Sequence, residues 1–166
     1  RLSRGLGDVY KRQDLIVCYG SSLIQEDLIN HFKGRFLNIH LGISPFYRGS
    51  GTNIWPMINK ELDLIGATFM HIDEGIDTGS VIKQIKAKIF LGDGPHSIGT
   101  RLIKDMTEEC AEIICSFEKI KSKTFSNKDG KLYKRNDFNQ QACKDLYEAF
   151  KTDMVEDYLI KKIKNK

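Results

Sequence analysis

The sequence lacks an uninterrupted apolar run of about 18 residues, which is the length that a membrane-spanning helix requires. The basic residues near its first position are not followed by the apolar segment of a secretory signal peptide. No Cys-x-x-Cys pair occurs among its four cysteines, which are Cys18, Cys110, Cys115 and Cys143. These absences argue against a membrane protein and a disulfide-rich secreted domain, so we expect reduced, buried thiols in a cytoplasmic protein.

A large charge of one sign is also missing, because the net charge is only +4 over 166 residues. The hydrophobic fraction of 40% and the charged fraction of 29% are ordinary for a globular protein of one domain. Residues 121–166 hold 12 Lys/Arg against 7 Asp/Glu, whereas residues 1–120 hold 14 against 15. Since no RNA-binding motif accompanies this excess, a solvated helical face explains it better than a nucleic-acid contact, which stays open as an alternative.

Strand-like and helix-like segments alternate along the centre of the chain. Short apolar runs at 14–20 and 35–41 predict strands buried on both faces, and further strands are expected at 64–73 and 80–89. Apolar residues at helical spacing predict a long amphipathic helix at 97–120. Shorter segments are expected as helices at 21–32, 50–60, 139–150 and 155–163 and as a short strand or turn at 131–135. This alternation predicts an α/β fold with a mostly parallel sheet flanked by helices.

The two ends of the chain differ from this central pattern. Residues 1–13 show no sustained apolar period, so we interpret them as foreign to the natural protein, with a disordered native N-terminus as the alternative. Residues 14–125 are predicted to form the principal domain, and residues 126–166, which open with the turn-rich SNKDG, a helical C-terminal appendage. On this interpretation the natural protein begins further upstream and the chain is a fragment.

Polar side chains interrupt the apolar run at 35–41 near its carboxyl end. Asn38 and His40 are two residues apart, so on a strand their side chains point to the same face. Chemistry in parallel α/β sheets collects at the carboxyl ends of the strands. A histidine with a purely structural role is the alternative, but two polar groups followed by a loop that Pro45 stiffens favour a functional site.

A second polar cluster, DEGIDTG at 73–79, follows the strand expected at 64–73. It is either a tight turn, in which Gly75 and Gly79 permit positive φ, or a part of the same site. In the second interpretation the Asp77 carboxylate reaches His40 and orients its ring through a hydrogen bond. We therefore predict that Asn38, His40 and Asp77 converge, with the imidazole and the carboxylate within about 8 Å of each other.

Taken together, these motifs resemble those of the 10-formyltetrahydrofolate-dependent formyltransferases. The shared pattern is Asn-x-His at 38–40, a proline-containing loop that closes in Arg-Gly at 48–49, and Asp-x-Gly at 77–79. The resemblance covers about residues 14–106. It implies a Rossmann-like formyltransferase domain that is truncated at its N-terminus, because the family's first strands and its glycine-bearing loop belong upstream of residue 14.

The resemblance implies transfer of a formyl group from 10-formyltetrahydrofolate to an amine through a tetrahedral intermediate, without a metal. Asn38 and His40 would donate hydrogen bonds to the developing oxyanion, and Asp77 would orient His40 and help to remove the amine proton. Arg48 and Gly49 are expected to contact the amine substrate. Folate contacts are expected from two loops, through Tyr19, Gly20, Ser21, Asp73, Glu74 and Gly75.

These motifs leave the acceptor open. We favour a small amine of the amino sugar nucleotide or glycinamide ribonucleotide type, and no membrane partner. Methionyl-tRNA formyltransferase is a rival interpretation, which is weakened because the C-terminal residues lack the short strands of its small barrel. A formyltetrahydrofolate hydrolase, with water as the nucleophile, and a non-catalytic Rossmann-like binding module also stay open. As a fragment, the chain is expected to be weakly folded and nearly inactive by itself, and its oligomeric state stays open.

Overall fold

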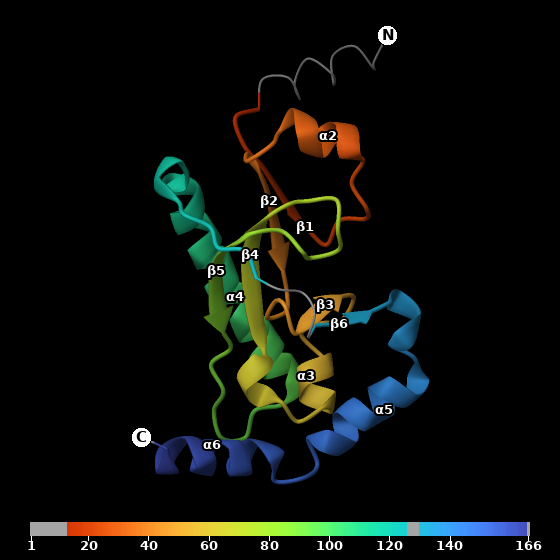
Figure 1. The fold of residues 1–166 in the computed structure, drawn as a ribbon. Helices are drawn as coiled ribbons and strands as arrows, with labels where there is room; N and C mark the ends of the chain where they lie inside the picture. The colour runs from red at the N-terminus through yellow and green to blue at the C-terminus, as the bar shows by residue number, and fades with distance from the viewer. Residues whose placement is uncertain (1–12, 126–129, 166) are drawn as a thin grey trace.

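The computed structural model describes residues 13–125 and 130–165. Its centre is a four-stranded sheet in the spatial order β1-β2-β4-β5 (Figure 1). The strands coincide with the predicted segments, with β1 at Ile16–Tyr19, β2 at Phe36–His40, β4 at Gly66–His71 and β5 at Val81–Lys86. The predicted α/β class is therefore confirmed. None of the helices in these described ranges is long and apolar enough to cross a membrane.

The direction of the strands differs from the prediction. β1 and β2 run parallel, but β2 pairs antiparallel with β4, and β4 pairs antiparallel with β5. Within the described residues this sheet is mixed, so the prediction of a mostly parallel sheet is wrong. The β4–β5 connection, residues 72–80, is shorter than the crossover of about a dozen or more residues that parallel strands need, so β5 returns antiparallel to β4. Between β2 and β4 the described chain forms the short helix α3, Trp55–Ile58, and the 3-10 helix Leu62–Leu64, besides the short strand β3 described below.

The edge position of β1 changes the environment of its side chains. Residues of β1 are half-buried rather than buried, and Tyr19 is 51% exposed. β2 lies between β1 and β4, and all of its apolar residues are buried. The prediction of a strand buried on both faces is therefore wrong for β1 and confirmed for β2, since a strand with one neighbour is covered less completely.

The long amphipathic helix predicted at 97–120 is present as α4, Pro95–Cys115, and it runs along one face of the sheet (Figure 1). The side chains that it buries lie on one stripe, at Ile98, Leu102, Met106 and Ile113. They belong to the same apolar core as Phe69 of β4. Burial of this stripe against the sheet is the main reason that α4 forms where it does.

A second, two-stranded sheet connects the loop after β2 to the C-terminal part of the chain. β3, Tyr47–Gly49, lies in the segment interpreted from the sequence as a stiff loop, and it pairs in parallel with β6, Lys131–Tyr133. The ring of Tyr133 stacks on Tyr47, with 5.7 Å between centroids, and on Trp55, with 4.4 Å. These stacked rings hold the end of β6 beside the segment that follows β2.

The C-terminal helices share the core of the sheet. α5, Gln140–Ala149, and α6, Met154–Lys164, contribute buried side chains to it, namely Leu146, Ala149, Met154 and Val155. α2, Glu26–His31, lies near the opposite end of the molecule (Figure 1). The remaining short 3-10 helices are Phe117–Lys119 and Arg135–Asp137. The predicted N-terminal segment lies outside the described residues except for residue 13, and the predicted boundary at 126–130 lies outside them except for residue 130.

We predict that Phe69→Ala lowers the free energy of unfolding by about 3–5 kcal/mol, because truncation of a core ring leaves a cavity. Phe69 is 2% exposed, whereas Leu91, the control position, is 73% exposed. Leu91→Ala is expected to change the stability by no more than about 0.5 kcal/mol. Urea denaturation followed by circular dichroism measures both variants, and equal losses would contradict this assignment of the core.

Candidate active site

Loops from distant parts of the chain enclose a cavity of about 890 Å³ beside β2. A volume of this size lies within the range of small-molecule sites, roughly 300–1,000 Å³. The lining comes from the segment after β1, the carboxyl half of β2, the turn after β3, the β4–β5 connection and the end of β6. In residue numbers these segments are 19–24, 38–41, 49–53, 70–79 and 132–135, together with residue 29.

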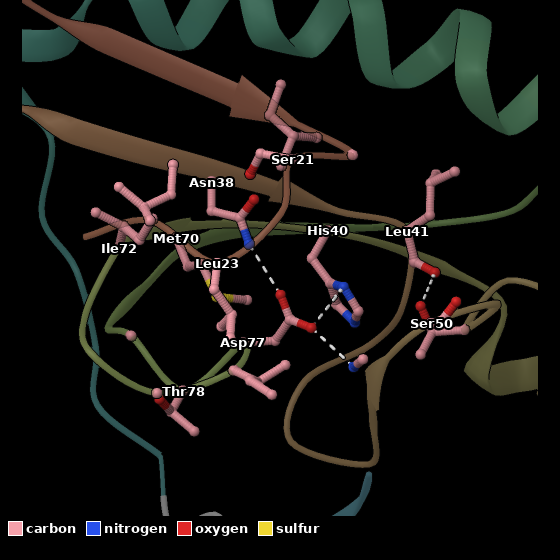
Figure 2. Close-up of a pocket in the computed structure, with 18 of the residues that line it drawn as sticks. Ser21, Leu23, Asn38, His40, Leu41, Ser50, Met70, Ile72, Asp77 and Thr78 are labelled. Atoms are coloured by element: carbon pink, nitrogen blue, oxygen red, sulfur yellow. Dashed lines mark hydrogen bonds and ion pairs between the residues drawn. The ribbon is translucent and has the colours of Figure 1, made fainter. Parts of the chain in front are cut away.

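The Asp77 carboxylate joins three elements at this cavity (Figure 2). Its Oδ1 accepts a hydrogen bond from Asn38 Nδ2 at 2.9 Å. Its Oδ2 accepts one from the backbone N–H of Gly49 at 2.8 Å and lies 3.2 Å from His40 Nδ1. The side chains of His40 and Asp77 are only 5% and 10% exposed. The predicted convergence of Asn38, His40 and Asp77 is therefore confirmed.

The position of this junction in the sheet differs from the prediction. Because β4 runs antiparallel to β2, its last residue, His71, pairs with Leu37 near the start of β2. The carboxyl ends of β2 and β4 therefore lie at opposite ends of the sheet. Asn38, His40 and Asp77 do not meet at the carboxyl ends of parallel strands, as was predicted. Instead, the connection 72–80 folds back toward β2 and brings Asp77 to Asn38 and His40 (Figure 2).

The β4–β5 connection holds Asp77 in a left-handed backbone conformation, with φ of +52°. This conformation costs an L-residue about 1–2 kcal/mol, although aspartate adopts it more readily than most residues. Asp73 stabilises the loop, because its Oδ1 accepts hydrogen bonds from Thr78 Oγ1 at 2.6 Å and from the Gly75 N–H at 3.1 Å. A strained residue that several contacts hold in place indicates a functional constraint.

Both ring nitrogens of His40 face hydrogen-bond acceptors. Nε2 lies 2.7 Å from the carbonyl oxygen of Tyr47, and Nδ1 faces Asp77. Carbonyl and carboxylate oxygens only accept, so an imidazole protonated at both nitrogens satisfies both partners. Gly42 leaves the space for this arrangement, because a Cβ there would lie 2.5 Å from His40 Nε2 and 2.9 Å from the Tyr47 oxygen.

Buried hydroxyl groups fix the path of the chain between β2 and β3. Thr68 Oγ1 donates to the Gly42 carbonyl at 2.6 Å and accepts from the Ser44 N–H at 3.1 Å, and Thr68 is fully buried. Thr52 Oγ1 donates to the Leu41 carbonyl at 2.6 Å. These bonds anchor the segment that leads to the Tyr47 carbonyl, so they position the His40 ring through the backbone.

The amide of Asn38 is oriented by a second contact on the opposite side. The Cys18 thiol donates to Asn38 Oδ1 across 3.4 Å, which turns the amide nitrogen toward Asp77. Burial raises the pKa of the Cys18 thiol, and the nearby charge of Asp77 raises it further, so the thiol keeps the proton that it donates. Asp77 takes one hydrogen of the amide, and within the described residues the other has no partner, so it is available to a ligand.

The remaining predicted site residues fall into two groups. All of the predicted folate contacts line the cavity, namely Tyr19, Gly20, Ser21, Asp73, Glu74 and Gly75. Gly49 lines it as well and binds Asp77 through its N–H. The structure does not bring Arg48 to the cavity, because its Nε is buried near Gly130 and has no hydrogen-bond partner among the described residues. Alternate residues of a strand point to opposite sides, which separates Arg48 from Gly49.

The sequence analysis missed three residues at the site. They are Tyr47, which acts through its carbonyl, and the cations Lys134 and Arg135, which directly follow β6. A backbone carbonyl leaves no signal in side-chain patterns, and the β3–β6 pairing joins segments that are far apart in the sequence.

The described part of the chain holds no group of three or more His, Cys, Asp or Glu that could bind a metal ion. All four cysteines are free thiols, but the expectation that they are buried is wrong, because Cys115 is exposed and the other three are half-buried.

These observations define an α/β domain whose small-molecule cavity contains a buried Asn–Asp–His junction suited to acid–base chemistry. A family model described as formyl transferase matches residues 9–114, and the chain belongs to that family.

Similar proteins include methionyl-tRNA formyltransferases, sugar N-formyltransferases and phosphoribosylglycinamide formyltransferases. The chain is 35% identical over 100 residues to a methionyl-tRNA formyltransferase of Desulforamulus reducens, a match that covers 60% of this chain and 31% of that protein. Its fold is similar to the formyltransferase PseJ from Anoxybacillus kamchatkensis, solved with UDP-4,6-dideoxy-4-formamido-L-AltNAc and tetrahydrofolate, with a TM-score of 0.69 and 27% identity over 76% of this chain and 67% of that one. It is also similar to the sugar 3N-formyl transferase WlaRD, solved with dTDP and 5-N-formyl-THF, with a TM-score of 0.65 and 29% identity over 75% of this chain and 46% of that one. The chain spans about a third or less of the length of the curated relatives that it matches.

We predict that Gly42→Ala displaces the His40 ring, because the added methyl group would overlap both His40 Nε2 and the Tyr47 carbonyl. The hydrogen-bonded ring N–H resonance of His40 is expected to shift and to exchange faster with water, as measured by NMR. Gly99→Ala is the control, since a Cβ there would meet only Asn53 Nδ2 at 4.0 Å. An unchanged His40 resonance in folded Gly42→Ala would contradict the role of this glycine.

A second prediction concerns the alkylation of Cys18 by iodoacetamide as a function of pH, measured peptide by peptide with mass spectrometry. Burial raises the pKa of Cys18, so less thiolate is present at a given pH and the alkylation midpoint lies above the ordinary thiol value. Asp77→Asn removes a charge that contributes to this rise, so the midpoint should fall while burial keeps it raised. A midpoint that does not move in Asp77→Asn would show that Asp77 does not face Cys18.

Proposed function

We propose that this chain carries the catalytic centre of a formyltransferase, which moves the formyl group of 10-formyltetrahydrofolate to a primary amine of a small substrate. The observation that carries the proposal is the Asp77 carboxylate, which contacts Asn38 and His40 within one open cavity. An amide donor, an imidazole and a carboxylate thus surround one point, as acyl transfer to an amine requires.

The lining of the cavity suits a flat heteroaromatic donor such as the pterin of a folate. Its walls combine backbone groups of the loop 72–79 with apolar side chains, which are Leu23, Ile29, Ile72 and Ile76. We assign the donor contacts to the residues predicted from the sequence, namely Tyr19, Gly20, Ser21, Asp73, Glu74 and Gly75. Support comes from PseJ and WlaRD, which were solved with tetrahydrofolate and 5-N-formyl-THF.

Asn38 and His40 stabilise the charge that develops during the reaction. Attack of the amine nitrogen on the formyl carbon forms a C–N bond and moves the carbonyl π electrons onto oxygen. The Asn38 hydrogen that Asp77 does not use donates to this oxygen, and the doubly protonated His40 places positive charge beside it. A preorganised donor of this kind is worth about 3 kcal/mol of transition-state stabilisation.

Asp77 acts as the proton acceptor in this proposal. The attacking nitrogen gains a positive charge, and the carboxylate takes its proton directly or through one water molecule. Breakage of the bond between the formyl carbon and N10 restores the carbonyl, and N10 takes up a proton, so the proton count is unchanged. The Gly49 N–H and the Asn38 amide hold the carboxylate in place for this transfer.

A small amine attached to a sugar nucleotide is the acceptor that we favour. The proposal is supported by the ligands of PseJ and WlaRD, a UDP-linked formamido sugar and dTDP. Methionyl-tRNA is the second candidate, because sequence relatives that match at 30% identity or more include methionyl-tRNA formyltransferases. The formylated product distinguishes the two acceptors, and free formate would identify a hydrolase instead.

We predict that His40→Ala lowers the rate of formyl transfer at least about a hundredfold, because the positive charge beside the developing oxyanion and the ion-pair partner of Asp77 are lost. The assay follows release of tetrahydrofolate and formylation of a panel of amines by mass spectrometry. His31→Ala is the control, since His31 lies on α2 and does not line the cavity. Full activity in folded His40→Ala would contradict the proposed mechanism. Formate as the sole product would contradict the assignment as a transferase.

A further inference from the structure

We propose that Asn59 and Glu61 form a clamp on the hydroxyl of Tyr47 and thereby act as positioning residues for the His40 ring. The inference rests on the proposed formyl transfer and deepens it, because it concerns the imidazole that faces the developing oxyanion. Neither clamp residue lines the cavity, and both are exposed at the end of α3. They act on the site only through the buried tyrosine between them and the imidazole.

Tyr47 reaches the imidazole through its backbone. Its carbonyl oxygen lies 2.7 Å from His40 Nε2, and both residues are buried. A buried N–H that loses its acceptor is strongly unfavourable, so the place of this carbonyl fixes the tilt of the ring. At the other end of β3, the Gly49 N–H holds Asp77 at 2.8 Å. The placement of β3 therefore sets the geometry of both members of the His40–Asp77 pair.

Two polar side chains hold the far end of the Tyr47 side chain. Its hydroxyl donates to Glu61 Oε2 and accepts from Asn59 Nδ2 at 2.8 Å. Burial raises the pKa of Tyr47, and the hydrogen bond to Glu61 and the charge of that carboxylate raise it further, so the hydroxyl keeps its proton and remains the donor. A hydrogen bond to a carboxylate is stronger than one between neutral groups, so this contact holds the ring firmly.

The turn after α3 presents both clamp residues to the tyrosine. The N–H of Lys60 donates to the Met57 carbonyl at 3.2 Å. The N–H of Glu61 donates to the Pro56 carbonyl at 2.7 Å. These two bonds define a Schellman motif, in which glycine is usual at the residue with positive φ. Lys60 takes that place here, with φ of +58°, and a strained residue held in this way indicates a constraint that the clamp explains.

The clamp also reaches the partner strand of β3. Asn59 Nδ2 donates to the Tyr133 hydroxyl at 3.2 Å. The ring of Tyr133 stacks on that of Tyr47 with an interplanar angle of 9°. Both strands of the small sheet are thus tied to the end of α3, which lies beside them (Figure 1). Loss of the clamp would let β3 shift and carry the carbonyl away from His40.

The first test follows the ring N–H of His40 by NMR in the 166-residue chain, without folate or acceptor. Tyr47→Phe keeps the ring but removes the clamped hydroxyl, so the Nε2 proton of His40 should exchange with water at least about fivefold faster.

Tyr158→Phe is the matched control, because the Tyr158 hydroxyl also donates to a carboxylate, that of Asp63 at 3.2 Å, and lies outside the cavity. Its distance from the site should leave the exchange rate of His40 within about twofold. Equal exchange rates in folded Tyr47→Phe and Tyr158→Phe would overturn the clamp.

The second test separates positioning from support of the fold, through the kinetics of formyl transfer. Glu61→Ala should lower kcat at least about fivefold, because the imidazole is displaced. The KM for 10-formyltetrahydrofolate and for the amine should stay within about twofold, because the cavity is unchanged. Glu61→Gln keeps an oxygen that accepts from Tyr47, so it should restore most of the rate. Glu108→Ala, which removes an exposed carboxylate of α4 outside the cavity, is the control.

Three kinetic results would overturn the positioning role. They are full kcat in Glu61→Ala, an equal loss in Glu61→Ala and Glu61→Gln, and a rise in KM with kcat unchanged. Absence of formyl transfer in the unmodified protein would count against the proposed function instead, whereas the exchange of the His40 ring proton judges the clamp separately.

Discussion

The Asp77 carboxylate accepts hydrogen bonds from two elements that are separated in the sequence, the Asn38 amide of β2 and the Gly49 N–H of β3. It also faces the buried ring of His40. A carboxylate that is only 10% exposed requires such partners, because burial of an unpaired charge is strongly unfavourable. The geometry of the site therefore depends on this one side chain, which the β4–β5 connection presents with φ of +52°.

The two sheets of the protein meet through this carboxylate. β2 belongs to the four-stranded sheet, whereas β3 and β6 form the two-stranded sheet. In that small sheet the ring of Tyr133 stacks on Tyr47 of β3 and on Trp55 of α3. Since Asp77 binds residues from both sheets, a shift of the small sheet would change the Asn38–Asp77–His40 geometry. The same pairing explains how residues beyond position 130 reach the cavity.

Prediction from the sequence was most successful where local pattern decides the structure. The apolar runs located β1, β2, β4 and β5, the helical stripe located α4, and the spacing of Asn38 and His40 predicted a shared face. Strand direction and the burial of β1 were predicted wrongly, because they depend on which strands become neighbours. No local pattern indicates that Arg48 lies outside the cavity while Gly49 lines it, since a three-residue strand within a loop sets that alternation.

A double-mutant cycle on His40→Ala and Asp77→Asn, measured as kcat/KM for formyl transfer, tests the central claim most directly. If the imidazole and the carboxylate act as one unit, the double variant should lose about as much activity as the more damaging single variant. Losses that add in free energy would show that the two groups act independently, and would contradict the account of Asp77 as the junction of the site.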